Sequence, residues 1–401
     1  MATGNGKFPQ MHPVQGFRLG TASAGIKTPG RKDLVVMALP ESASVAAVFT
    51  QNAFCAAPVA VAKQHLHSVT PRYLLINTGN ANAGTGQAGL ADAQQSCQVL
   101  ADLQAVSAAQ VLPFSTGVIG EKLPMDKLLA GIPKAIEALN ENGWADAAEG
   151  ILTTDTRPKG SSLQFSLDGV LDRPSEGAHS NSDLSITVTI TGITKGSGMI
   201  KPNMATMLGF VATDAQIDSE LLHRALRLVT NKSFNRITVD SDTSTNDAVV
   251  LAATGASGVV IDESNFDQFV GNLEKVFIEL AQSIIRDGEG ASKFVSVVVD
   301  GTLDSAEALK VAYCIAESPL VKTALAASDA NWGRILAAVG RAGVDNLDVD
   351  KVTVSLNGVL IVEQGCRAAS YTEEAGEQAM AAEDITIQVS LNRGTASETV
   401  W

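Results

Sequence analysis

Cysteine and histidine are scarce in this 401-residue chain. The four cysteines lie far apart and form no Cys-x-x-Cys pair, so neither a disulfide framework nor a zinc site is expected. Among the five histidines only His65 and His67 are close, and their spacing does not place both on one helix face. The sequence therefore predicts no metal site, disfavours Ser-His-Asp or Cys-His catalysis, and fits a reduced cytosol.

Basic charge and long apolar runs are also lacking. Lys and Arg number 29 against 43 Asp and Glu, so the formal net charge is −14. Such acidity argues against nucleic acid and anionic membranes as partners, although a small anionic substrate still fits a locally basic pocket. No apolar run is long enough to span a bilayer, and the N-terminus has no secretory-signal pattern. We expect a cytoplasmic protein with no nucleic-acid and no membrane partner.

Apolar residues are plentiful at 45%, enough for a large core. Their patterns predict strands at 33–40, 44–50, 73–77, 184–194, 294–300 and 384–391. Helical patterns cover 90–106, 125–139, 218–229 and 266–285. Pro133 should break or kink the second of these helices, and Asp218 should cap the third. A hairpin with an Asn357-Gly358 turn is expected within 352–362, and 172–183 should be a surface loop. Without regular βαβ alternation, the elements indicate α+β layers rather than a doubly wound sheet.

The stretch 195–210, KGSGMIKPNMATMLGF, fits neither a helix nor a solvated loop. A structural turn is the simplest interpretation, and the phosphate-loop spacing GxxxxGK[ST] is absent. A third interpretation starts from Thr206, whose hydroxyl is a poor nucleophile without a nearby base. If the bond before Thr206 were broken, its own α-amine, with an ordinary pKa of about 7.7–8.0, would supply that base without any histidine.

Three further polar clusters each have a structural and a functional interpretation. PFSTGVIGE, at 113–121, is either an ordinary turn or a tight turn that offers a hydroxyl and a backbone N–H to an oxyanion. ILTTDTRPKG, at 151–160, is either a capped turn or the polar wall of a pocket. Glu289 lies between two glycines after the longest helix, either in a solvated turn or facing a substrate ammonium. None of these clusters is decisive alone.

Taken in order, the motifs resemble the ornithine acetyltransferase family, also called glutamate N-acetyltransferase or the bifunctional arginine-biosynthesis enzyme. The resemblance covers nearly the whole chain. It rests on AVFTQN, AAPV, NTGNANAGTG, STGVIGE, TTDTRPK, KGSGMIKPNMATML, DSDTSTND, EGASK and SPLVKTALAASDANWGRILAAVGR. It implies an α+β fold, an αββα-layered sandwich of the ornithine acetyltransferase or N-terminal-nucleophile aminopeptidase-like type.

The resemblance also implies a reaction. The chain should cut itself between Ala205 and Thr206, giving an alpha chain, 1–205, and a beta chain, 206–401, that stay associated. Thr206 should then take acetyl from N2-acetyl-L-ornithine and pass it to L-glutamate through an acetyl-threonine ester, with ping-pong kinetics.

Other site residues follow from the matched motifs. Thr116 and Gly117 match the family's oxyanion pair. Lys195 would hold an α-carboxylate or polarise the site, and Glu289 would face an ornithine ammonium. The full set of matching substrate-contacting positions is Thr153, Lys195, Thr206 and Glu289. No cofactor and no metal are implied, acetyl-CoA is a co-substrate only in bifunctional members, and the assembly would be a heterotetramer of two alpha and two beta chains.

The sequence departs from the family pattern at its end. Relatives continue beyond the position of Trp401 with a short tail that supplies an Asn and a terminal Ser or Thr to the substrate. Either the chain is a truncated version or this member lacks these two contacts, and we expect the chain as it stands to bind acetylornithine weakly. Gly84 stands where a Cys is common, which we interpret as packing. The alternative function is a related N-terminal-nucleophile amidohydrolase or aminopeptidase, although those usually carry Ser rather than Thr206. A non-catalytic binding protein of the same fold would keep the bond before Thr206 intact.

Overall fold

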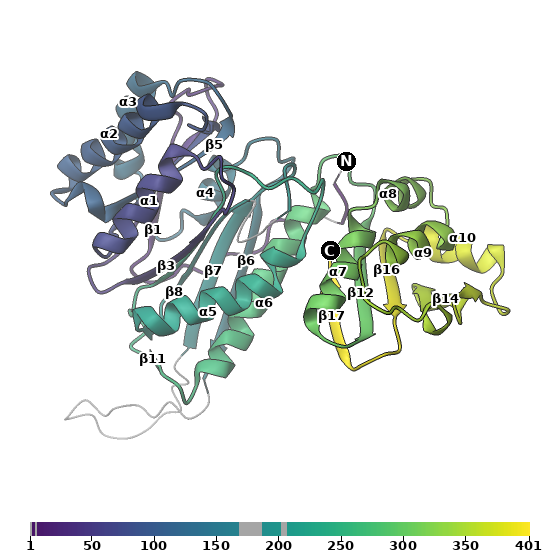
Figure 1. Ribbon diagram of the computed structural model, residues 1–401. Helices are drawn as coiled ribbons and strands as arrows, with labels where there is room; N and C mark the ends of the chain where they lie inside the picture. The colour runs from purple at the N-terminus through teal and green to yellow at the C-terminus, as the bar shows by residue number, and fades with distance from the viewer. Residues whose placement is uncertain (1, 5, 168–186, 202–206) are drawn as a thin grey trace.

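The computed structural model describes residues 2–4, 6–167, 187–201 and 207–401. Figure 1 shows two facing sheets with their helices in the N-terminal two thirds of the chain and a separate sheet with its own helices in the C-terminal part. The predicted surface loop 172–183 and the residues Ala205 and Thr206 lie outside the described residues. No helix in the described part is long and apolar enough to cross a membrane.

The first sheet lies under three helices. Its strands run in the order β1 (Arg18–Ala22), β2 (Leu34–Ala38), β4 (Tyr73–Asn80) and β5 (Val111–Val118), with only β4 and β5 parallel. Its outer face is covered by α1 (Ala57–Ser68), α2 (Gly86–Gln104) and α3 (Met125–Glu137). Since successive strand residues point to opposite faces, Val36 and Leu75 pack under these helices while Val35 and Ile76 face the second sheet.

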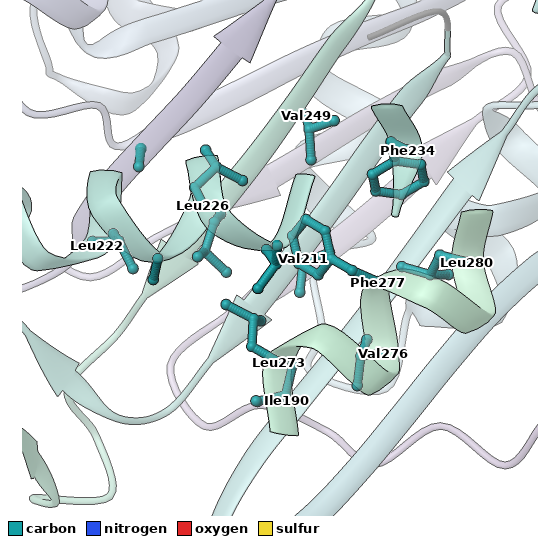
Figure 2. Close-up of a cluster of buried hydrophobic side chains, with 14 of the residues drawn as sticks. Ile190, Val211, Leu222, Leu226, Phe234, Val249, Leu273, Val276, Phe277 and Leu280 are labelled. Atoms are coloured by element: carbon teal, nitrogen blue, oxygen red, sulfur yellow. The ribbon is translucent and has the colours of Figure 1, made fainter. Parts of the chain in front are cut away.

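The second sheet carries five strands and two long helices. The order is β3 (Ser44–Phe49), β10 (Ala248–Ala253), β8 (Leu208–Thr213), β7 (Thr187–Lys195) and β6 (Lys159–Ser166). The outer face packs against α5 (Ser219–Lys232) and α6 (Phe266–Arg286). Figure 2 shows this contact, with Val211 and Val249 of the sheet against Leu226 of α5 and Phe277 of α6.

A shared core joins the inner faces of the two sheets. Phe114 of β5 and Phe210 of β8 meet edge to face, with ring centroids 5.2 Å apart and planes at 83°. Both rings are almost completely buried, at 2% and 0% exposed. The layers are therefore helix, sheet, sheet, helix, and the predicted αββα sandwich is confirmed.

The C-terminal part forms a third sheet with its own core. Its strands run in the order β15 (Cys366–Arg367), β14 (Val359–Glu363), β13 (Thr353–Leu356), β16 (Asp384–Ser390), β12 (Phe294–Thr302) and β17 (Ala396–Val400). Its helices are α7 (Ser305–Ala316), α8 (Pro319–Ala326), α9 (Trp332–Gly340) and α10 (Glu373–Ala381). Short elements elsewhere include α4 (Trp144–Gly150), β9 (Gln216–Ile217) and β11 (Val260–Ile261).

The predictions that rested on strong local signals are confirmed. The Asp218 carboxylate caps α5 by accepting hydrogen bonds from the backbone N–H groups of Glu220 and Leu221, at 2.8 and 3.0 Å. The hairpin between β13 and β14 turns at Asn357 and Gly358, whose φ angles of 46° and 82° fit a type I′ turn. All six predicted strands are present, the one at 184–194 in its described part.

Helix α3 is continuous through Pro133, so the predicted break is absent. It packs so closely on β1 that a Cβ atom on Gly20 would lie 2.0 Å from the Ala135 carbonyl oxygen, and this tertiary contact outweighs one lost helical hydrogen bond. Strand β17, which the sequence patterns did not predict, follows β16 and pairs antiparallel with β12.

Candidate active site

A cavity of about 540 Å³ opens where β4, β5 and β7 end, beside the loops that follow α4 and α6. Its wall includes every predicted site residue that the structure describes. These residues are Thr116, Gly117, Thr153, Lys195 and Glu289. The fold therefore brings together side chains that lie far apart along the sequence.

The predicted nucleophile Thr206 and its neighbour Ala205 lie outside the described residues, but the chain on either side is described. Leu208, two positions after Thr206, pairs with Lys195 across β7 and β8. Met207 is buried, and its carbonyl oxygen accepts a hydrogen bond from the backbone N–H of Ala248 at 3.0 Å. The segment that follows Thr206 is thus anchored in the sheet beside Lys195.

Thr116 and Gly117 end strand β5 and do not form the tight turn that the sequence predicts. The ladder between β4 and β5 becomes irregular at this point, beside Gly79. Gly117 has φ 137°, and a Cβ atom on it would lie 2.3 Å from the carbonyl carbon of Gly79, so only glycine fits. The turn prediction is wrong because the parallel partner β4 extends as far as this segment. The hydroxyl of Thr116 makes no hydrogen bond to another described residue.

Thr153 lies in the loop between α4 and β6. This loop is both a capped turn and a polar wall of the cavity, the two interpretations of the cluster at 151–160. The Asp155 carboxylate accepts a hydrogen bond from the backbone N–H of Thr153 at 3.0 Å, as expected for a capped turn. Thr153 and Thr154 also line the cavity, and the Thr154 hydroxyl lies 2.8 Å from the hydroxyl of Ser197. The turn is therefore also a polar wall of the pocket.

Lys195 ends β7, where it pairs with Leu208 of β8. Burial lowers the pKa of Lys195 below its ordinary value, while the carboxylate of Asp155, and that of Asp247 once it is ionised, oppose the shift. Burial alone would raise the pKa of Asp155, but the ammonium groups of Lys195 and Lys159 hold it well below its usual range. Lys195 is therefore a buried amine whose ammonium form is favoured by the neighbouring Asp155 carboxylate.

Glu289 lies in an exposed turn two residues beyond Asp287, which caps α6. Its backbone N–H donates to the Ser197 carbonyl oxygen at 2.8 Å, which ties the turn to the segment after β7. The side chain also lines the cavity, so the exposed turn presents a carboxylate to it. That this carboxylate faces a substrate ammonium stays a prediction.

Sequence reasoning missed several groups of the site. Lys27 and Arg31, from the loop between β1 and β2, add two cations to the wall. Asp33 holds that loop in place by accepting hydrogen bonds from the backbone N–H groups of Ala24 and Ile26, both at 2.6 Å. The sequence feature that could have identified them is a basic segment with Gly and Pro between two predicted strands, which is unusual in so acidic a chain. These cations suit a substrate that carries carboxylates.

The loop before β10 completes the wall with Ser244, Thr245 and Asn246. The Asn246 amide donates to the Ala81 and Ser115 carbonyl oxygens, at 2.6 and 2.8 Å, and so fixes the end of β5. Within the described ranges no group of three or more His, Cys, Asp or Glu could hold a metal ion. The cavity thus offers hydroxyl, backbone, ammonium and carboxylate groups.

The four layers and this cavity define a class: an αββα protein whose polar pocket is suited to acyl-group chemistry without histidine. The chain belongs to the ArgJ family, whose model matches residues 18–401. The resemblance to ornithine acetyltransferases is thereby confirmed.

Curated relatives match the whole chain. It is 55% identical over 405 residues to the arginine biosynthesis bifunctional protein ArgJ of Pseudomonas syringae pv. tomato, with 100% of this chain and 96% of the relative covered. Identity to the protein of the same name from Methylococcus capsulatus is 52%, with 97% and 92% covered.

Two solved structures match parts of the chain. One is the arginine biosynthesis bifunctional protein ArgJ of Bacillus halodurans, 38% identical, with 48% of this chain and 91% of that chain covered at a TM-score of 0.46. The other is the ornithine acetyltransferase of Mycobacterium tuberculosis complexed with ornithine, 35% identical, with 48% and 94% covered at a TM-score of 0.41.

Proposed function

We propose that the cavity is the site where an acetyl group moves from N2-acetyl-L-ornithine to L-glutamate through an ester on Thr206. Membership of the ArgJ family makes the chain an acetyltransferase of arginine biosynthesis. The observation that supports the site is the convergence of Thr116, Gly117, Thr153, Lys195 and Glu289 on one cavity. The relatives are bifunctional proteins by name, so we infer that acetyl-CoA also serves here as a co-substrate.

The first step of the proposal is self-cleavage between Ala205 and Thr206. The Thr206 hydroxyl oxygen attacks the Ala205 carbonyl carbon, and the peptide C–N bond breaks as the ester forms and the hydroxyl proton passes to the leaving nitrogen. Water then hydrolyses the ester, which leaves a carboxylate on Ala205 and a free hydroxyl and α-amine on Thr206. That amine is the base the hydroxyl needs.

The sheet pattern supports two chains that stay together after the cut. Strand β7 belongs to 1–205 and pairs with β8 of 206–401 over six residue pairs, from Ile190↔Thr213 to Lys195↔Leu208. Strand β3 pairs with β10 across the same divide. The predicted cut therefore falls between partner strands of one sheet, and the inter-sheet core spans both pieces.

Acetyl transfer then proceeds in two halves. The Thr206 amine takes the hydroxyl proton, the oxygen attacks the acetyl carbonyl carbon of acetylornithine, and the amide C–N bond breaks as the proton passes to the leaving ornithine amine. The glutamate amine attacks the ester in the reverse sense and restores the hydroxyl. Thr116 and Gly117 stabilise the oxyanion in both halves.

Charged groups of the cavity hold the substrates. The Lys195 ammonium pairs with the α-carboxylate that both amino acids carry, and the Glu289 carboxylate pairs with the side-chain ammonium of ornithine. Thr153 contributes a hydroxyl and the backbone of its loop. No step of this scheme requires a metal or a bound cofactor, and we place the reaction in the cytoplasm in a heterotetramer of two alpha and two beta chains.

Intact mass spectrometry of the purified protein tests the proposal. Two fragments divided between Ala205 and Thr206 are expected, and incubation with acetylornithine alone should add one acetyl group to the fragment that begins at Thr206. Glutamate should remove that group as N-acetylglutamate. Rapid release of acetate without glutamate would instead favour the related amidohydrolase, and an uncut chain with no acetyl adduct would favour a binding protein.

A further inference from the structure

A buried charge network lies directly behind the cavity. The Lys159 ammonium contacts the carboxylates of Asp155 and Asp287, each with an Nζ–Oδ distance of 2.6 Å. The three side chains are at most 1% exposed. Except for the Asp155 contact with Thr153, none of these groups has a role in the proposed reaction.

Asp155 connects two of the proposed substrate-binding segments. One carboxylate oxygen accepts a hydrogen bond from the backbone N–H of Gly196 at 2.7 Å, and the other accepts from the backbone N–H of Thr153 at 3.0 Å. Gly196 directly follows Lys195, so this single carboxylate fixes the end of β7 against the Thr153 loop.

Asp287 connects the third segment. It accepts hydrogen bonds from the backbone N–H of Thr156, at 3.0 Å, and from the Thr156 hydroxyl. Asp287 also caps α6 two residues before Glu289. Lys159 therefore joins a carboxylate beside Thr153 and Lys195 to a carboxylate beside Glu289.

Such a network is a poor way to gain stability, because taking three charges out of water offsets much of their mutual attraction. Its hydrogen bonds converge instead on the three segments that line the cavity. We infer that Lys159, Asp155 and Asp287 are positioning residues, which hold the Lys195 ammonium and the Glu289 carboxylate at the separation that the amino-acid substrate requires. The inference rests on the proposed function of Lys195 and Glu289 as substrate-binding groups.

The charges around Lys195 make the inference testable, because they predict the direction in which each variant moves the Lys195 pKa. The carboxylates of Asp155 and Glu289, and that of Asp247 once it is ionised, favour its ammonium form, whereas the Lys159 ammonium disfavours it. Lys27, Arg31 and Asp33 also face the cavity, from the loop between β1 and β2. Removing Asp155 therefore lowers the pKa of Lys195, and removing Lys159 raises it.

The experiment measures kcat and KM for acetylornithine and glutamate across pH in the mature enzyme. Asp155→Asn should raise KM for both substrates by at least about tenfold and move the alkaline limb of kcat/KM down by about one pH unit. Lys159→Met should also raise KM but move the same limb up. Asp287→Asn should raise KM and move the limb less than Asp155→Asn does, because Asp155 is the strongest of the charges that favour the Lys195 ammonium.

Lys32→Met is the matched control. Lys32 also contacts two carboxylates, of Asp146 and Glu149, at 2.5 and 2.6 Å, but on the surface, so its KM and limb should equal those of the wild type. If the limb is unchanged in both charge variants, or moves the same way in both, the network only stabilises the fold and the inference is wrong. If Lys159→Met does not fold, the nearly isosteric Asp155→Asn still tests the inference, through the shift of its alkaline limb of kcat/KM. A wild type without an acetyl-Thr206 adduct would contradict the proposed function instead.

Discussion

Gly198 lies directly against the carboxylate of Glu289. A Cβ atom placed on Gly198 would be 2.6 Å from the carboxyl carbon Cδ and 2.7 and 2.8 Å from the two oxygens. The absence of a side chain at 198 therefore lets the segment after β7 pass close to the carboxylate that we assign to substrate ammonium binding. The sequence alone did not indicate that Gly198 and Glu289 are in contact.

Gly198→Ala should weaken substrate binding with little loss of stability. The added methyl group must displace the end of the flexible Glu289 side chain, which costs little in folding but moves the carboxylate away from its position. We expect KM for acetylornithine to rise roughly tenfold, with a smaller change in kcat. Steady-state kinetics and thermal unfolding of the same preparation measure both effects.

Gly271→Ala is the control for this substitution. Gly271 lies in α6, and a methyl group there would meet no atom within 4 Å apart from the backbone of its own helix. Alanine should therefore leave KM unchanged and raise stability by up to about 1 kcal/mol. Equal kinetics for Gly198→Ala and the wild type would contradict the assignment of Glu289.

Local signals explain why much of the fold was predictable. Helix α5 carries its own cap at Asp218, the β13–β14 hairpin has the Asn357-Gly358 pair, and α6 has an apolar face that matches its buried residues. Predictions from sequence failed where tertiary contacts determine the local structure. Helix α3 keeps Pro133 because of its packing on β1, and the end of β5 stays extended because β4 lies beside it.

The cavity could not be predicted from local pattern alone. Each polar cluster had a plain turn as its simplest explanation, and only the resemblance to a family related the clusters to one another. The network of Lys159, Asp155 and Asp287 was missed for the same reason, since its third member comes from the end of α6, far along the chain. Long-range juxtaposition of this kind leaves no periodic signal in the sequence.

Thr116→Ala should lower the rate of transfer while the fold stays intact. The Thr116 hydroxyl makes no hydrogen bond to another described residue, so its removal should cost no more than about 1 kcal/mol of unfolding free energy. Loss of one oxyanion donor typically lowers kcat by about 10²–10³-fold. Thr116→Ser keeps the hydroxyl and should recover most of the rate. An unchanged kcat in Thr116→Ala would remove this hydroxyl from the mechanism.

Thr206→Ala should abolish both self-cleavage and transfer, because it removes the nucleophile of both reactions. Thr206→Ser should retain part of each, since a hydroxyl and an α-amine remain available. Denaturing electrophoresis shows cleavage, and trapping of the acetyl group shows the covalent step. Normal acetyl transfer by an uncut Thr206→Ala chain would overturn the covalent mechanism.

Asp247→Asn should stabilise the protein increasingly as pH rises. Burial raises the pKa of Asp247 well above its usual range despite hydrogen bonds from Ser244, and its Oδ2 atom has no hydrogen-bond partner among the described residues. Above about pH 3.9 the unfolded chain ionises this group while the folded chain keeps the proton, so the folded state binds more protons and loses stability with rising pH.

Asparagine at position 247 removes that loss. The difference in unfolding free energy between Asp247→Asn and the wild type should therefore grow by up to about 1.4 kcal/mol per pH unit until the folded group itself ionises. Denaturant unfolding at several pH values measures it. A pH-independent difference for Asp247→Asn would mean that the buried carboxyl ionises as readily as in water.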